Sequence, residues 1–175
     1  MSEPESPQTD RKHKRLLRWL AEGLLFLLII YLIHLWQIRE SVEGPAPQLS
    51  SQQLLNGGTF EIHKRPKEPL LVYFWASWCP VCGLSSGNID ALSKEHAVVT
   101  VAMQSGEPAE VARHLTEKGL KFPVIVDSTG EIARSWGVHG VPTLYVLDAE
   151  NRIRFVSVGY TSTPGLITRM WFAGK

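Results

Sequence analysis

The strongest constraint on the fold is the passage from an apolar run, "LLVYFWA" at 70–76, into the only two cysteines of the chain, Cys79 and Cys82. The run is rich in aromatic and branched apolar residues, which is typical of a buried strand. Pro80 suits the first position of a helix, because the N–H that proline lacks would have no helical partner there. The sequence therefore predicts a strand that turns into a helix, with Cys79 as the N-cap residue.

The same alternation continues to the end of the chain. Further strand-like runs lie at 97–103, 123–127, 143–148 and 153–160, and helix-like stretches at about 80–95, 107–118, 130–136 and 164–173. Residues 148–152 predict a turn that makes the last two strands a hairpin, and 59–63 is a candidate edge strand. Strands that alternate with helices and finish in a hairpin and a helix predict an α/β fold with a mixed sheet.

Residues 19–38 predict a transmembrane helix. These twenty residues contain one acidic residue and no Lys or Arg, and a helix of that length spans about 30 Å. Trp19 and Trp36 lie near the two ends, where aromatic residues anchor such helices. A cleaved signal peptide is the alternative, but the small residues at which it could end, Gly44 and Ala46, are each followed by proline. An uncleaved signal anchor is therefore expected.

The distribution of charge predicts how this segment is oriented. Five basic residues precede it and only Arg39 closely follows it, so the N-terminus is expected in the cytoplasm and the rest in the periplasm, beyond a bacterial inner membrane. The predicted parts are a cytoplasmic tail at 1–18, the anchor, a linker at 39–58 and a folded domain at 59–175. The net charge of +1 argues against nucleic acid as a partner.

The predicted position of Cys79 at a helix N-terminus favours its thiolate. An N-cap acceptor receives hydrogen bonds from backbone N–H groups two and three residues on, here those of Val81 and Cys82. The helix dipole also favours negative charge there, and the thiolate is the nucleophilic form. Cys82 lies on the same helical face, at a spacing that a disulfide can close. An exposed, activated Cys79 with Cys82 behind it predicts reversible thiol–disulfide exchange.

Other uses of a cysteine pair fit the sequence less well. A zinc site needs about four ligands, and the histidines are scattered without a pair at zinc-binding spacing. An inert structural disulfide here would close a very small loop and constrain little of the unfolded chain. A non-enzymatic Cu(I)-binding protein is a further alternative, because Cu(I) favours thiolates, although no Met or His cluster adjoins the pair in the sequence.

The chain also resembles a known superfamily. "FWASWCPVC" (74–82) resembles the W-C-x-x-C active site of thioredoxins, and "GVHGVPTLYVLD" (137–148) resembles their cis-proline loop. With "FPVIVDSTGEIARSWGV" (122–138), the chain is similar to the membrane-anchored TlpA/DsbE-type branch, in particular to ScsD-like proteins of the suppressor-of-copper-sensitivity system. The resemblance covers about residues 59–172. It implies a thioredoxin-like fold behind an N-terminal anchor, and protein-disulfide oxidoreductase activity.

The resemblance assigns roles to individual residues. Cys79 is expected to attack a substrate disulfide and Cys82 to resolve the resulting mixed disulfide. Pro142 is expected to be the cis-proline beside the sulfurs, and the backbone of Val141 to hold a substrate segment as a neighbouring strand would. Trp78 is expected to flank the site as an exposed aromatic residue. The predicted substrate-binding loop residues are Trp78, Pro80, Val81, Val141 and Pro142.

Two departures from the superfamily bear on the chemistry. Thioredoxins carry a buried aspartate six residues before the first cysteine, where this chain has Tyr73. Other members of the branch carry a glutamate soon after the motif, but this chain has no acidic residue there before Asp90. A phenol with a pKa of about 10 is a poor base at neutral pH, so the proton acceptor is unassigned. Strong oxidants of the superfamily stabilise the thiolate of the reduced form, and the resemblance implies that a histidine between the cysteines is one device for this. Pro80 and Val81 donate no side-chain hydrogen bond, so the pair is predicted to be relatively reducing.

The predicted function is therefore a membrane-tethered periplasmic oxidoreductase that reduces disulfides in protein substrates. The resemblance implies a membrane electron shuttle of the DsbD or ScsB kind as its reductant, and copper tolerance as its setting. A disulfide oxidase or isomerase, differing only in redox direction, stays open as an alternative, as does the Cu(I)-binding protein. No metal and no cofactor beyond the redox-active Cys79–Cys82 disulfide is expected.

Overall fold

The structure is a computed structural model that describes residues 8–39, 44–47, 49 and 52–175. The chain divides into two compact units between Gln37 and Ile38.

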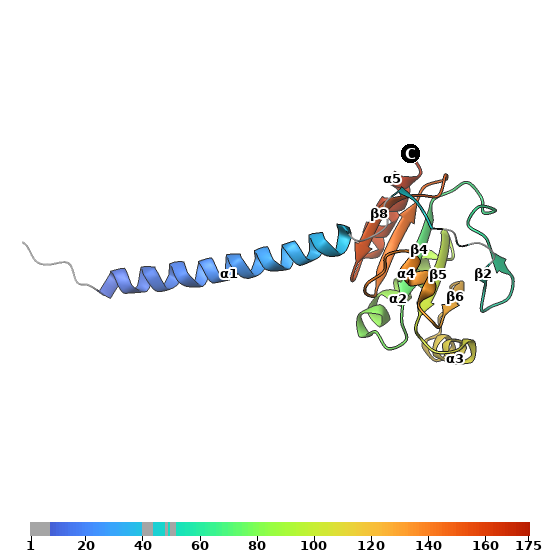
Figure 1. The fold of residues 1–175 in the computed structure, drawn as a ribbon, viewed down its shortest axis with the longest axis horizontal. Helices are drawn as coiled ribbons and strands as arrows, with labels where there is room; N and C mark the ends of the chain where they lie inside the picture. The colour runs from blue at the N-terminus through green and yellow to red at the C-terminus, as the bar shows by residue number, and fades with distance from the viewer. Residues whose placement is uncertain (1–7, 40–43, 48, 50–51) are drawn as a thin grey trace, which may run out of the picture. The chain divides into compact units, whose positions relative to one another are not determined.

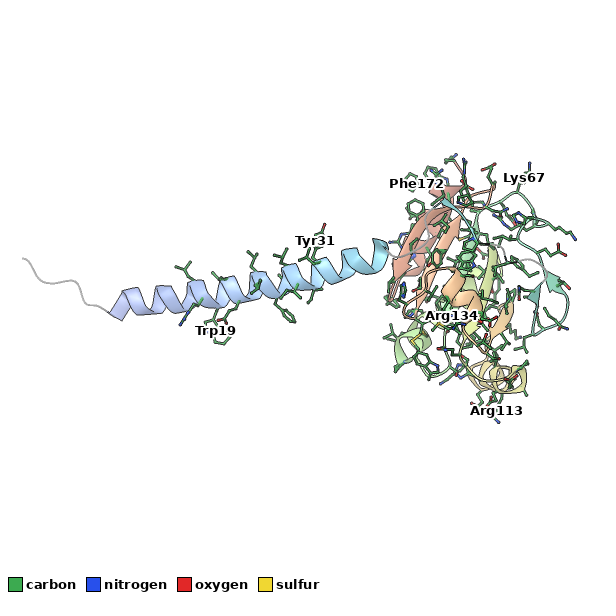
Figure 2. All side chains as sticks on the ribbon, in the orientation of Figure 1. Trp19, Tyr31, Lys67, Arg113, Arg134 and Phe172 are labelled. Atoms are coloured by element: carbon green, nitrogen blue, oxygen red, sulfur yellow. A yellow bond between two sulfur atoms is a disulfide. The ribbon has the colours of Figure 1, made fainter. Side chains whose placement is uncertain are left out.

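The described part of the first unit belongs to helix α1 (Gln8–Arg39), which is 32 residues long and whose last two residues fall in the second unit. The helix contains the predicted segment 19–38 and begins before it, because the basic residues that precede Trp19 are good helix formers. The apolar side chains from Leu17 to Leu32 are exposed, and Figure 2 shows Trp19 and Tyr31 pointing away from the helix. Among the described residues, no helix has both the length and the apolar character needed to cross a membrane.

The second unit is built on a mixed six-stranded sheet. Its strands are β1 (Gly44–Pro45), β4 (Leu70–Trp75), β5 (Ala97–Met103), β6 (Val124–Asp127), β7 (Thr143–Leu147) and β8 (Arg152–Val158). They lie in the order β1-β8-β7-β4-β5-β6; Figure 1 labels β8, β4, β5 and β6, which follow one another in this order. β4, β5 and β6 are parallel, whereas β7, β8 and β1 continue from β4 by antiparallel pairing. The predicted mixed sheet is confirmed.

Helices cover both faces of this sheet. They are α2 (Pro80–Leu92), α3 (Pro108–Lys118), α4 (Glu131–Ser135) and α5 (Thr163–Ala173). Alternate residues of β4 face opposite sides: Tyr73 and Trp75 pack with residues of α2, α3 and α5, whereas Val72 and Phe74 pack with Trp136 at the end of α4. Every residue of β4 is buried, which is why this strand reads as a continuous apolar run. The strand that leads to the cysteines is thus the centre of the core.

The prediction that 59–63 adds an edge strand to the sheet is wrong. Thr59–Phe60 (β3) pairs instead with Gln52–Gln53 (β2) in a separate two-stranded ribbon. The intervening turn contains Gly57 and Gly58, both at positive φ, where glycine is favoured. Short strands pair with whichever strand the connecting turn brings to them, and here that is β2. The segment predicted as a linker, 39–58, therefore contains two short strands, β1 and β2, and β3 follows directly after it.

Candidate active site

The loop between β4 and α2 is held by the end of β5. The backbone N–H of Ser77 donates to the Ser105 hydroxyl at 3.0 Å, and the indole N–H of Trp78 donates to the carbonyl of Gln104 at 3.0 Å. Within the loop, the N–H of Cys79 donates to the carbonyl of Ala76 at 3.2 Å. β4 and β5 are neighbouring parallel strands, so the carboxyl ends of both strands meet here. Their pairing fixes the position of Cys79.

Cys79 is the N-cap residue of α2, as predicted. Its backbone is extended, with φ −93° and ψ 111°, and Pro80 occupies the first turn. Of the two expected donors, the structure shows the N–H of Cys82, whose nitrogen lies 3.1 Å from Cys79 Sγ. Cys79 and Cys82 form a disulfide across a Cα–Cα distance of 5.3 Å. The local geometry thus provides a donor that favours a thiolate on the first cysteine.

The expectation that Cys79 is exposed is wrong in degree. Cys79 is 7% exposed and Cys82 is 1% exposed, so both lie in the core cluster beneath α2. Cys79 is covered because the loop before β7 reaches it: the carbonyl oxygen of Val141 lies 3.5 Å from Cys79 Sγ. Cys79 is still the more accessible of the two, which is the order that attack by Cys79 and resolution by Cys82 requires.

The structure brings the predicted Val141 and Pro142 to the cysteines across 62 residues of sequence. The peptide bond between Val141 and Pro142 is cis. β7 begins directly after it, and Thr143 pairs with Phe74 of β4 in the antiparallel ladder. The strand pairing that places the end of β4 therefore also places this loop. Trp78 is 60% exposed and Val81 is 41% exposed, so two apolar side chains flank the buried sulfurs at the surface.

Tyr73 lies directly below the pair and cannot replace an acid. Its hydroxyl donates to the carbonyl of Cys82 at 3.3 Å, and the Ser86 hydroxyl donates to the same carbonyl at 2.8 Å. Burial raises the pKa of Tyr73 to about 12, against the opposite effect of hydrogen bonds with Ser86 and Ser85. Tyr73 is therefore protonated at neutral pH and acts as a donor. Tyr73 is therefore no base for the exchange at neutral pH.

A cavity of about 490 Å³ adjoins the cysteines. Both cysteines line it, together with Trp78 from the loop and two side chains from α3, His114 and Lys118. The His114 ring stacks on the indole of Trp75, with centroids 5.5 Å apart and planes at 30°. Sequence reasoning missed His114, because nothing in the local pattern of α3 relates this residue to Cys79 or Cys82. Val141 and Pro142 do not line this cavity.

The site has no features of a metal centre in the part of the chain that the structure describes, where no three His, Cys, Asp or Glu side chains lie together in a way that could hold an ion. The chemistry available at the site is that of the cysteine pair. A buried disulfide at a helix N-terminus, with a cis-proline loop against one sulfur, can exchange with a disulfide or dithiol brought to its surface.

Comparison with known proteins agrees with this chemistry. The Redoxin family profile matches residues 41–168. A thioredoxin-like protein of Haemophilus influenzae is 33% identical over 165 residues, covering 93% of this chain and 97% of that protein. The thiol:disulfide interchange protein DsbE of Escherichia coli K12 is 26% identical over 153 residues, covering 78% of this chain and 82% of DsbE.

Solved structures show the same fold. A thiol:disulfide interchange protein of the thioredoxin family from Chlorobium tepidum superposes with a TM-score of 0.65 at 24% identity, covering 76% of this chain and 97% of that protein. This likeness confirms the thioredoxin-like arrangement of sheet and helices, and the curated relatives together with the Cys79–Cys82 disulfide identify the activity. The chain belongs to the Redoxin family, and it is a thiol-disulfide oxidoreductase of the DsbE/ResA type.

Proposed function

We propose that this oxidoreductase works as a reductase: its Cys79–Cys82 dithiol delivers electrons to disulfides in protein substrates outside the inner membrane. The observation that supports the reducing direction is the set of groups around Cys79 Sγ. Among the described residues, the backbone N–H of Cys82 donates to this sulfur, whereas the Val141 carbonyl oxygen lies 3.5 Å away on another side. The two neighbours have opposite effects on a thiolate.

A carbonyl oxygen beside the sulfur accepts a hydrogen bond from a thiol but repels a thiolate. The side chains between the cysteines, Pro80 and Val81, have no donor with which to offset that repulsion. Strong oxidants of this kind have reduced forms that are stabilised, and this site stabilises its reduced form weakly. The reduction potential is therefore expected near that of thioredoxin, about −270 mV, rather than near that of DsbA, about −120 mV.

The proposed reaction proceeds in two exchanges. The Cys79 thiolate attacks one sulfur of a substrate disulfide, so that a mixed disulfide forms and the other substrate sulfur leaves as a thiolate. Cys82 then attacks Cys79 Sγ, which forms the Cys79–Cys82 disulfide and releases the second substrate thiolate. The substrate segment lies along the backbone at Val141 and Pro142, with Trp78 and Val81 as apolar contacts. No further cofactor takes part.

We further propose that the reductase is tethered. Residues 19–38 would act as an uncleaved anchor in the bacterial inner membrane, with 1–18 in the cytoplasm and the folded part, predicted as 59–175 beyond a linker at 39–58, in the periplasm. The support is the exposed apolar stretch of α1 and the basic residues that precede it. Tethering raises the effective concentration of a domain near a membrane partner.

The reductant of the site is proposed to be a membrane electron shuttle of the DsbD or ScsB kind, and the setting copper tolerance, on the strength of the resemblance to ScsD-like proteins. Two experiments test the proposal. Equilibration of the full-length protein with glutathione mixtures gives the reduction potential, and a value near about −120 mV would make the protein an oxidase instead. A reporter enzyme that is active only in the periplasm, fused after Lys175, tests the orientation.

A further inference from the structure

The second exchange needs a proton acceptor, and neither Tyr73 nor the serines beside Cys82 provide one. Cys82 must lose its proton before it attacks Cys79 Sγ, and a free thiol has a pKa of about 8.5. Cys82 is 1% exposed, and burial in apolar surroundings raises a thiol pKa further. Tyr73 is protonated at neutral pH. The hydroxyls of Ser85 and Ser86 already donate to the carbonyls of Val81 and Cys82.

The cavity beside the sulfurs contains a candidate from another element. His114 of α3 lines the same cavity of about 490 Å³ as Cys79 and Cys82. Its ring is held against Trp75 by stacking at 5.5 Å, and Trp75 is itself fixed, because its indole N–H donates to the Thr100 hydroxyl at 3.1 Å. The imidazole is therefore positioned at a wall shared with the sulfurs, in a space large enough for water.

We propose that His114 is the proton acceptor for Cys82 when the mixed disulfide is resolved, with water in the cavity carrying the proton between them. The Cys82 thiol gives its proton to neutral His114 through that water and becomes a thiolate. The thiolate forms a bond to Cys79 Sγ and breaks the bond to the substrate sulfur, which leaves with the electron pair. The proton on His114 then passes to the departing thiolate or to solvent, so His114 is neutral again.

Burial, helped by the nearby Lys118 charge, keeps His114 in the accepting form. Burial lowers the pKa of His114 below its usual 6.5, the Lys118 ammonium lowers it further, and the Glu117 carboxylate raises it. His114 also lines a second hollow with Glu110, Arg113 and Glu117 of the same helix; Figure 2 shows Arg113 projecting away from α3. The walls that face His114 from the β4–α2 segment are Trp75, Ser77, Trp78 and the cysteines, which carry no fixed charge.

This inference deepens the proposed function and needs only exchange at Cys79 and Cys82, whichever way electrons flow. The test uses the full-length protein, reduced and freed of reductant, mixed rapidly with the aromatic disulfide dithiobisnitrobenzoate. Attack by Cys79 releases one coloured thiolate in a first phase, and resolution by Cys82 releases the second. The first phase thus reports whether Cys79 reacts at all, and the second reports the resolution step assigned to His114.

Two variants remove the acceptor in different ways. His114→Gln keeps a polar side chain, and His114→Phe keeps an aromatic ring for Trp75 to stack on. Both are expected to retain the first phase and to slow the second by about 100-fold at pH 7, the lower end of general-base contributions. His63→Gln, at an exposed histidine outside the cavity, is the matched control and should leave both phases unchanged.

The pH dependence distinguishes proton acceptance from packing. In the wild-type protein, the second phase should rise with pH and level off, with an inflection below 6.5, because neutral His114 predominates above its lowered pKa. In both variants that inflection should be lost, and the rate should keep rising with pH up to the pKa of the buried Cys82 thiol, which lies above about 8.5. A wild-type second phase in His114→Phe, or an unchanged inflection in both variants, overturns the assignment. A wild-type protein without a first phase would overturn the proposed reductase as well.

Discussion

Placing a hydrogen-bond donor between the cysteines should make the pair more oxidising, and Val81→His is the change that tests this. Val81 lies in the first turn of α2, directly before Cys82, and is 41% exposed, so an imidazole can replace it without disturbing the core. The N–H of Cys82 already donates to Cys79 Sγ at 3.1 Å, while the Val141 carbonyl oxygen opposes a thiolate from 3.5 Å. An imidazole N–H at position 81 would add a second donor to Cys79 Sγ and so stabilise its thiolate.

The size of the effect follows from the strength of one added hydrogen bond. A hydrogen bond to a charged group contributes about 1.5–3 kcal/mol, and the lower end applies because the site of substitution is partly exposed and screened by solvent. For a two-electron couple, about 1.4 kcal/mol corresponds to 30 mV. The potential should therefore rise by about 30 mV in Val81→His, and the pKa of the Cys79 thiol should fall by about one unit.

Both quantities can be measured on the full-length protein. Equilibration with glutathione mixtures gives the potential, and the absorbance of the thiolate as a function of pH gives the pKa. Val81→Phe is the matched control, because it has an aromatic ring of similar size without a donor, and it should leave both values unchanged. A potential that does not move in Val81→His, or that moves equally in Val81→Phe, refutes the account of the reducing direction.

Three further predictions concern the pair, its neighbour and the fold. Cys82→Ser should accumulate mixed disulfides with partner proteins, whereas Cys79→Ser should accumulate none; equal trapping on non-reducing gels contradicts the assigned roles. Tyr73→Phe should lower the free energy of unfolding in urea by about 1 kcal/mol, because the hydrogen bond to the Cys82 carbonyl is lost. The pH profile of thiol–disulfide exchange should stay unchanged, and an altered profile would give Tyr73 a titrating role. Burial raises the pKa of Asp148, but hydrogen bonds from Arg152 outweigh it and the net pKa is lowered from 3.8. The ionised Asp148 therefore stabilises the fold above about pH 4, and this stabilisation is lost as the pH falls through the pKa of the folded state. In urea titrations, the free energy of unfolding of Asp148→Asn should depend less on pH in that acid range. An unchanged dependence would count against this role of Asp148.

The fold from residue 70 onward could be predicted because its signals are local. The buried run before Cys79, the proline that opens α2 and the turn before β8 each act within a few residues. All predicted strands and helices in that part are present, with shifted bounds. The segment 59–63 was placed wrongly because a two-residue strand has no periodicity that selects its partner, and the turn at Gly57 and Gly58 pairs it with β2.

In the site, too, local signals could be predicted and long-range contacts could not. Cys79, Cys82 and Pro142 could be named from their motifs, and the N-cap geometry of Cys79 from Pro80 alone. The burial of Cys79 could not be predicted, because the Val141 carbonyl that covers it arrives through the pairing of β7 with β4. The proposed redox direction therefore rests on that contact as well as on the residues between the cysteines.

By itself, the sequence determined the redox pair, the helix start that favours a thiolate, the class of fold and the identity of the residue, Tyr73, that stands in place of an acid. Each of these depends on neighbours along the chain. Only the tertiary structure decided what surrounds the sulfurs: the Val141 carbonyl on one side, and on another a cavity that His114 of α3 shares with both cysteines. Such contacts join residues tens of positions apart through sheet pairing and helix packing, and no local pattern encodes them.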